Sequence, residues 1–159
     1  MSEPQFSHDP TAARTLTAES LYSAADAKAA FDDDEHDADG IGLVLTRHDQ
    51  LLVCEFGRAW TDAGVATPIA EILTGLGRTV VERTDNDGLR AFYRGRLPPA
   101  VRGGEPIVVD LVAHEQVYPL RLFDSGWVPL TGKRAPNAPK TIQPVDPHAL
   151  SGLLSEIAH

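Results

Sequence analysis

Apolar and polar residues alternate along Gly40–Gly57 with the period of two that is typical of β-strands. In the first half, one face carries apolar side chains at Ile41, Leu43 and Leu45. In the second half, one face carries Leu51, Val53, Glu55 and Gly57. Residues 47–50 between the halves are polar, and a connection of four residues suits a hairpin. We therefore predict two paired strands, with the carboxylate of Glu55 near the end of the second.

Apolar residues recur at helical spacing in three other segments. The first begins near Thr17 and carries Leu21, Ala24, Ala25 and Phe31. The second begins at Thr67-Pro68 and ends at Gly77, because proline suits the first turn of a helix and glycine suits its end. The third follows Asp146-Pro147, an N-cap sequence, and has an apolar stripe of Leu150, Leu153, Leu154 and Ile157. We predict a helix in each segment.

The remaining chain between residues 78 and 130 has the pattern of further strands. Segments 78–83 and 89–94 flank a turn sequence at 84–88, and segments 107–112 and 117–123 flank residues 113–116. A short strand at 127–130 contains Pro129, which suits the edge of a sheet. The predicted fold class is therefore α+β, a mostly antiparallel sheet with helices on one side.

The length of 159 residues suits one domain. We expect a flexible N-terminal lead-in over residues 1–15 and an α+β domain over 16–134. Residues 135–159 are then a proline-rich segment and a final helix that packs on the domain. The acidic run at 32–39 is predicted to be a solvated loop.

Net charge, cysteine count and the length of apolar runs exclude several classes of function. A formal net charge of −9 argues against a broad nucleic-acid-binding surface, although it leaves room for a local one. One cysteine excludes an internal disulfide, and we expect Cys54 to be a buried apolar residue. The N-terminus lacks a signal pattern and no apolar run is long enough for a membrane span, so we expect a cytoplasmic protein without a membrane partner. The excess of arginine over lysine and of aspartate over glutamate suggests a halophilic source.

Four segments in the same order along the chain carry a resemblance to a known family: Asp37–Thr46, 51–57, Asp87–Pro98 and Arg121–Arg134. They resemble the primase–polymerase-like domains of phages and plasmids, which belong to the archaeo-eukaryotic primase superfamily. Asp37–Thr46 is similar to that family's Asp-Gly-Ile-Gly strand, and LLVCEFG at 51–57 lies where the family has a strand ending in Asp-x-Asp. Asp87–Pro98 is similar to a Gly-Leu-His segment that ends in Gly-x-Leu-Pro. Arg121–Arg134 is similar to a Glu-x-Tyr-Asp-x-Gly-Arg stretch that ends in Thr-Gly. The resemblance implies a primase–polymerase-like fold and a role in DNA replication, in a mobile element or its host.

The family's catalytic positions are mostly replaced in this chain. In working members, two strand-end carboxylates and a later acidic residue hold divalent metal ions, and a histidine contacts nucleotide phosphates. The corresponding positions here are Glu55, Gly57, Arg121 and Arg90. The resemblance therefore implies a degenerate site at Glu55, Arg90 and Arg121, without polymerase activity and without a favoured cofactor.

This replacement is physically coherent. Two carboxylates about 4 Å apart repel by about 4 kcal/mol at an effective dielectric of ~20, so they need cations between them. Arginines at two of the positions supply fixed positive charges in place of metal ions. We expect Glu55 to pair with Arg90 or Arg121.

Several functions remain open. Arg90, Arg94 and Arg96 form a basic stretch that suits phosphate, which favours binding of single-stranded DNA or a nucleotide. A replication protein acting in trans is another possible partner. Alternatively, Glu55 and Asp110 hold Mg²⁺ or Mn²⁺ in a divergent nucleotidyltransferase of the primase or polymerase type. A last alternative is an interaction or inhibitory module that uses its acidic surface.

Overall fold

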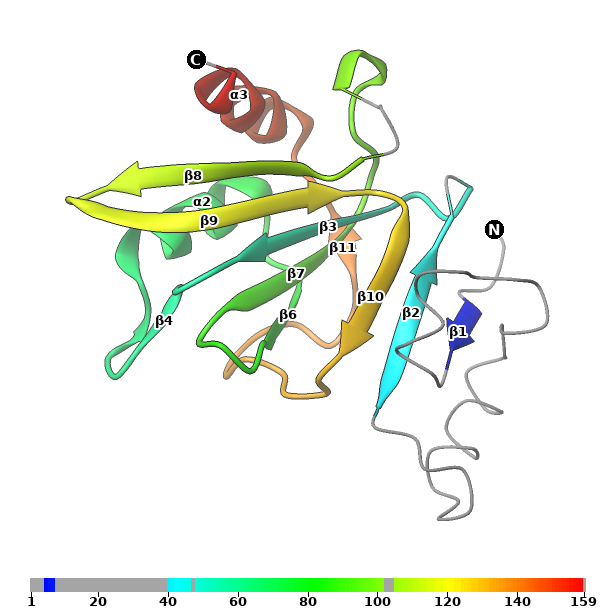
Figure 1. The fold of residues 1–159 in the computed structure, drawn as a ribbon, viewed down its shortest axis with the longest axis horizontal. Coiled ribbons are helices and arrows are strands. Elements are labelled where there is room, and N and C mark those ends of the chain that lie inside the picture. The colour runs from blue at the N-terminus through cyan, green and yellow to red at the C-terminus, as the bar shows by residue number, and fades with distance from the viewer. Residues whose placement is uncertain (1–4, 8–39, 47, 102–104, 159) are drawn as a thin grey trace. The chain divides into compact units, whose positions relative to one another are not determined.

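The computed structural model describes residues 5–7, 40–46, 48–101 and 105–158 (Figure 1). Its contacts divide the chain into two compact units. The small unit comprises Met1–Gln50 and Asp124–Gly132, and the large unit comprises Leu51–Phe123 and Lys133–His159. Within the described ranges, no helix is long and apolar enough to cross a membrane. The predicted helix near Thr17 and the acidic run at 32–39 lie outside the described residues.

The small unit contains a three-stranded antiparallel sheet. Its order is β1 (Gln5–Ser7), β2 (Ile41–Leu45) and β10 (Gly126–Leu130), so β10 with its Pro129 is at an edge, as predicted. Strand β1 falls within the segment that the sequence predicted to be a lead-in. Trp127 of β10 lies over Gly42 of β2, where its ring occupies the space that a Cβ atom would need.

The predicted hairpin within Gly40–Gly57 is wrong, although both of its strands exist. Strand β2 pairs with β1 and β10, whereas β3 (Leu51–Phe56) pairs with β7 and β9. Each strand therefore has both of its edges occupied by other partners. A short polar connection is compatible with a hairpin, but it does not compel the two flanking strands to pair.

The large unit is built on a six-stranded sheet (Figure 1). Its main order is β11 (Gln143–Pro144), β7 (Leu89–Arg94), β3, β9 (Gln116–Phe123) and β8 (Ile107–Ala113), and β6 (Val80–Arg83) also pairs with β7. All pairings are antiparallel except that of β11 with β7. A small hairpin of β4 (Trp60–Thr61) and β5 (Gly64–Val65) and a 3-10 turn, η4 (Pro99–Val101), complete the unit.

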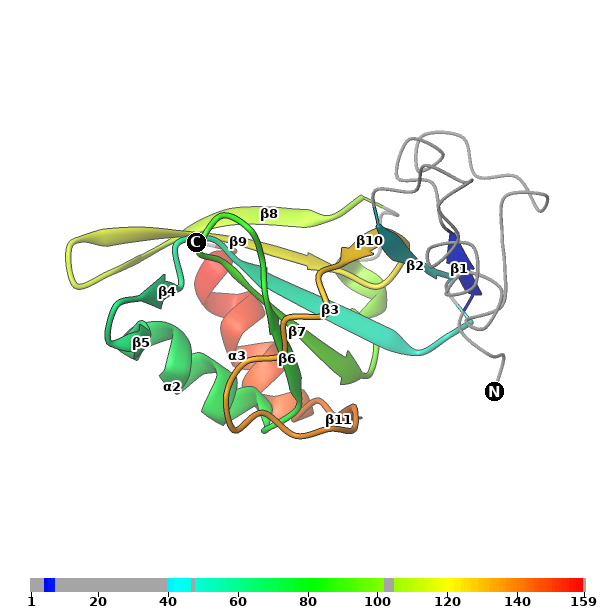
Figure 2. The same cartoon turned by 90° about the horizontal axis from the view of Figure 1, so that it is seen from below.

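Helices α2 (Thr67–Leu76) and α3 (Pro147–Ile157) lie on the same side of this sheet (Figure 2). Gly77 ends α2 with a φ of 111°, and its N–H donates to Leu73 O at 3.1 Å. Asp146 caps α3 by accepting from the N–H groups of His148 and Ala149. Both termini were predicted from the sequence, and the α+β class with mostly antiparallel sheets is confirmed.

Alternation along the strands determines which side chains meet the helices. One face of the sheet packs with both helices in a single core, which includes Leu52, Cys54, Phe56, Ile69, Leu76, Leu89, Ala91, Tyr93, Leu120, Leu122, Leu150 and Leu153. Cys54 is fully buried, as expected, and burial raises the pKa of its thiol, so the group stays protonated. The other face of the same strands carries the charged residues.

We predict that Gly42→Ala destabilises the small unit, because the new Cβ atom overlaps the ring of Trp127. Overpacking of this kind costs about 1–3 kcal/mol. Gly40→Ala is the matched control, since no atom of the described residues beyond its chain neighbours lies within 4 Å of a Cβ placed at Gly40. Urea unfolding followed by tryptophan fluorescence measures both variants, and equal stabilities for the two would contradict the packing described here.

Candidate functional site

Glu55 lies on β3, between two strands that each place an arginine opposite it. Its register partners are Arg90 on β7 and Arg121 on β9. Directly paired residues of neighbouring strands project from the same face, so the three side chains lie side by side. The flanking residues Cys54 and Phe56 point to the opposite face, into the core. The face that carries Glu55 also carries the buried apolar residue Val53, which pairs with Phe92 and Phe123.

Arg90 is a buried cation held by two carboxylates. Its Nε donates to Glu55 Oε1 at 2.8 Å and its Nη1 donates to Glu82 Oε1 at 2.6 Å. Arg90 and Glu82 are each only 5% exposed. Glu82 lies on β6, opposite Arg90 in the β6–β7 hairpin. A planar guanidinium can donate to two carboxylates at once, which lysine's single ammonium does with less geometric control.

Arg121 completes the group from the solvent side. Its Nη1 lies 3.5 Å from Glu55 Oε2, and its guanidinium lies 4.6 Å from the centre of the Phe123 ring. The side chain is 45% exposed, so water screens this ion pair more strongly than the pair of Arg90. Both carboxylate oxygens of Glu55 thus face arginines.

The alternation of arginine and glutamate continues beyond β6, to Arg134. Arg134 lies opposite Glu82 in an isolated antiparallel bridge, and backbone hydrogen bonds on either side hold residues 133–135 against β6. We call the row of Arg134, Glu82, Arg90, Glu55 and Arg121 the charge row. Its signs alternate along the row, so every carboxylate has an arginine as register partner on both sides.

Position 57 is a glycine, and Pro119 packs into the space beside it. The ring of Pro119 lies 3.2 to 3.3 Å from a Cβ atom built on Gly57, while Gly57 N donates to Pro119 O at 2.7 Å. A side chain at position 57 therefore requires Pro119 to move. The packing at position 57 therefore involves two strands, β9 as well as β3.

The predicted pairing of Glu55 is confirmed, and it involves Arg90 and Arg121 together rather than one of them. Sequence reasoning missed Glu82. The sequence contained the information needed to find it. The turn at 84–88 fixes the register of the hairpin around it and places position 82 opposite position 90. Taking that register into account would have identified the second carboxylate of Arg90.

The three arginines of the predicted phosphate site differ in environment. Arg94 and Arg96 are exposed, whereas Arg90 is buried between its carboxylates. Arg94 lies four residues along β7 from Arg90, which is about 13 Å at the rise of a strand. Arg90 therefore belongs to the charge row, and Arg94 and Arg96 form a separate exposed basic pair.

Asp110, the other ligand in the metal alternative, lies on the same face as Glu55 but in a different row. It pairs with Pro119, whereas Glu55 pairs with Arg121, two residues further along β9. Two strand spacings and this offset separate the Cα atoms by about 12 Å. In the part of the chain that the structure describes, no group of three or more His, Cys, Asp or Glu residues has a metal-binding arrangement.

Comparison with known proteins does not assign the chain to a family. No family model matches the chain, and no match is found among curated proteins.

We predict that Arg90→Ala lowers the free energy of unfolding by about 3–5 kcal/mol, because it removes the short contacts to two carboxylates, one of them buried. The matched control is Lys133→Ala. This lysine forms an exposed pair with Asp85 at 2.9 Å, and such pairs contribute about 0–1 kcal/mol. Urea denaturation measures both variants. A loss for Arg90→Ala no larger than that for the control would show that the buried contacts are not stabilising.

Proposed function

We propose that the chain is a primase–polymerase-like domain that has lost nucleotidyl transfer and binds single-stranded nucleic acid through phosphate contacts. The observation that carries this proposal is the charge row at the positions where the resembled family holds its metal ions. Both oxygens of Glu55 are directed at arginines, and position 57 is packed against Pro119.

The chemistry of phosphoryl transfer supports the loss of activity. Two metal ions stabilise the attacking and leaving oxygens in such sites, and they need a cluster of acidic ligands. At the corresponding positions this chain has one carboxylate between two guanidinium groups. Arginine charges stabilise an anion but do not lower the pKa of a bound hydroxyl as a metal ion does.

Phosphate binding is supported by the exposed arginines. Arg94 and Arg96 lie at the end of β7, and Arg121 presents a half-exposed guanidinium on the same sheet face as Arg94. Arginine matches phosphate oxygens with paired N–H donors. Because the whole chain is strongly acidic, binding is expected to be local and highly sensitive to salt.

A second candidate function, docking on a replication protein, is favoured by a different observation. Val108 and Val112 on β8 are 68% and 73% exposed, and Val117 on β9 is 39% exposed. In the described sheet, β8 is the last strand. An exposed strand edge with apolar side chains suits pairing with a strand of a protein partner.

We predict no product from the protein in primer-synthesis and primer-extension assays with Mg²⁺ or Mn²⁺. An active primase–polymerase assayed in parallel is the positive control. Glu55→Ala is the diagnostic variant: metal-dependent product from the natural sequence that disappears in this variant would overturn the proposal and favour the nucleotidyltransferase alternative.

We predict that Arg94→Ala and Arg96→Ala each reduce the salt dependence of single-stranded DNA binding by about 0.7 in the slope of log K against log salt concentration. Fluorescence anisotropy with a labelled oligonucleotide measures the slope. Lys140→Ala is the control, because it removes one exposed positive charge elsewhere in the large unit. Identical slopes for the natural sequence and both arginine variants would contradict phosphate contacts at these residues.

A further inference from the structure

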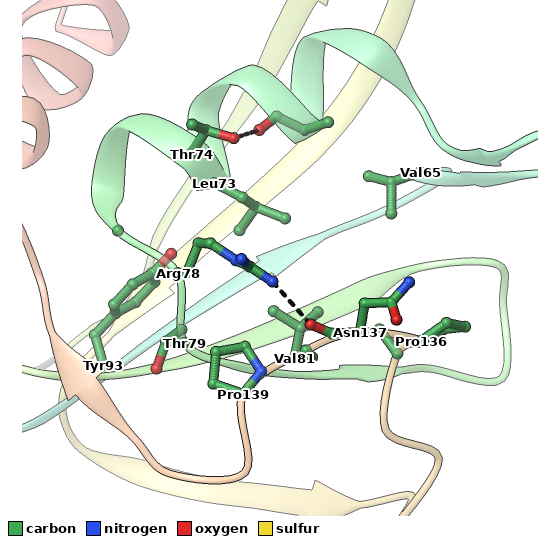
Figure 3. Close-up of a pocket in the computed structure, with 14 residues that line it drawn as sticks. Val65, Leu73, Thr74, Arg78, Thr79, Val81, Tyr93, Pro136, Asn137 and Pro139 are labelled. Carbon is green, nitrogen blue, oxygen red and sulfur yellow. Dashed lines mark hydrogen bonds between the residues drawn. The ribbon is translucent and has the colours of Figure 1, made fainter.

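A cavity of about 210 Å³ lies on the helix side of the large unit, away from the charge row (Figure 3). Its walls come from α2, from β6 and β7, and from residues 135–139. Most of the lining is apolar, including Leu73, Val81 and Pro136, as Figure 3 shows. A cavity of about 150 Å³ is sufficient for a benzene molecule, so this space suits an aromatic ring with a small substituent.

One buried polar group behind the wall of this cavity has no partner among the described residues. The hydroxyl of Tyr93 is inaccessible to solvent and makes no hydrogen bond with any described residue. A buried hydroxyl without a partner is costly, and such groups are rare in folded proteins. Burial raises the pKa of this hydroxyl, with a smaller contribution from Cys54, so it remains a neutral donor.

The neighbouring hydroxyl, that of Thr79, has both a hydrogen-bond acceptor and a donor as partners. Thr79 donates to Phe92 O at 2.5 Å and accepts from Gln143 N at 2.9 Å. Its hydrogen bonds join β6, β7 and the segment before α3. The hydroxyl of Tyr93 therefore differs from that of Thr79, and because it is inaccessible to solvent it does not face the open space of the cavity.

Arg78 supplies a positive charge to the same cavity. Its side chain extends from the end of α2 toward residues 135–139, and its Nη2 donates to the backbone oxygen of Asn137 at 3.0 Å (Figure 3). This bond uses one of five N–H donors and pairs the cation with a neutral acceptor. The remaining N–H groups can donate to an anion, and Arg78 has no ion pair with a described residue that such binding would break.

We infer that this cavity binds a small organic monoanion, an aromatic carboxylate in which the ring fills the apolar space. Arg78 pairs with the carboxylate, and the ring packs against the apolar lining. A carboxylate bound by arginine gains charge-assisted hydrogen bonds that a neutral ring lacks. The inference is independent of the proposed nucleic-acid binding, because the lining residues Val81 and Tyr93 belong to the core face of the sheet and the charge row lies on the other face.

The test uses benzoate as probe, with toluene as the neutral analogue and acetate as the anion without a ring. A ligand of about ten non-hydrogen atoms is expected to bind with a Kd in the millimolar range or tighter, so thermal unfolding is measured up to about 10 mM of each. Benzoate should raise the unfolding midpoint with a saturating dose dependence, whereas acetate should not. No response to benzoate, or a response to toluene of the same size, would overturn the inference.

Variants locate the site. Arg78→Gln should weaken benzoate binding about tenfold, since it removes a charge-assisted contact. Ala138→Phe should abolish the response by filling the cavity from its wall. Arg58→Gln is the matched control, because it removes an exposed arginine that does not line the cavity. A benzoate response that is unchanged in Arg78→Gln and Ala138→Phe would place binding elsewhere and refute the assignment.

Tyr93→Phe provides a readout that does not depend on ligand. Removing a buried unpaired hydroxyl should raise the unfolding midpoint of the ligand-free protein by about 2–4 °C. Benzoate binding should be retained in this variant, because the inaccessible hydroxyl does not contact the ligand. Loss of the benzoate response would contradict the assignment of binding to Arg78 and the apolar lining.

Discussion

The buried guanidinium of Arg90 is the constraint on which the charged face of the large unit depends. Removing this cation from water is costly, and only close carboxylates on the neighbouring strands offset the loss. Glu55 and Glu82 provide them at 2.8 and 2.6 Å. These contacts work only in one register, because a slip of one residue would move every charge to the core face. The ion pairs therefore specify how β6, β7 and β3 align.

Arg121 gives this buried arrangement a connection to solvent. The group of Glu82, Arg90 and Glu55 has one more negative than positive charge, and the half-exposed Arg121 balances it. The charge row thus changes from buried at β7 to exposed at β9. Fixed charges of this kind hold neighbouring strands together.

The two faces of the sheet in the large unit carry different proposed sites. The face with Arg94 and Arg121 carries the proposed phosphate contacts, and the face with Tyr93 and Val81 carries the helices and the cavity. Alternation along β7 alone accounts for this separation, since consecutive residues point to opposite sides. Changes on one face therefore leave the chemistry of the other largely intact.

The sequence by itself determined the local elements: the start and end of α2, the capped start of α3, the β6–β7 and β8–β9 hairpins and the charged position of Glu55. Each depends on residues close together in the chain, such as Pro68, Gly77 and Asp146. Only the tertiary structure decided that β2 and β3 take different partners, that Pro119 packs on Gly57, and that the Tyr93 hydroxyl has no partner. These features arise from contacts between distant segments, whose packing a local pattern of polar and apolar residues does not encode.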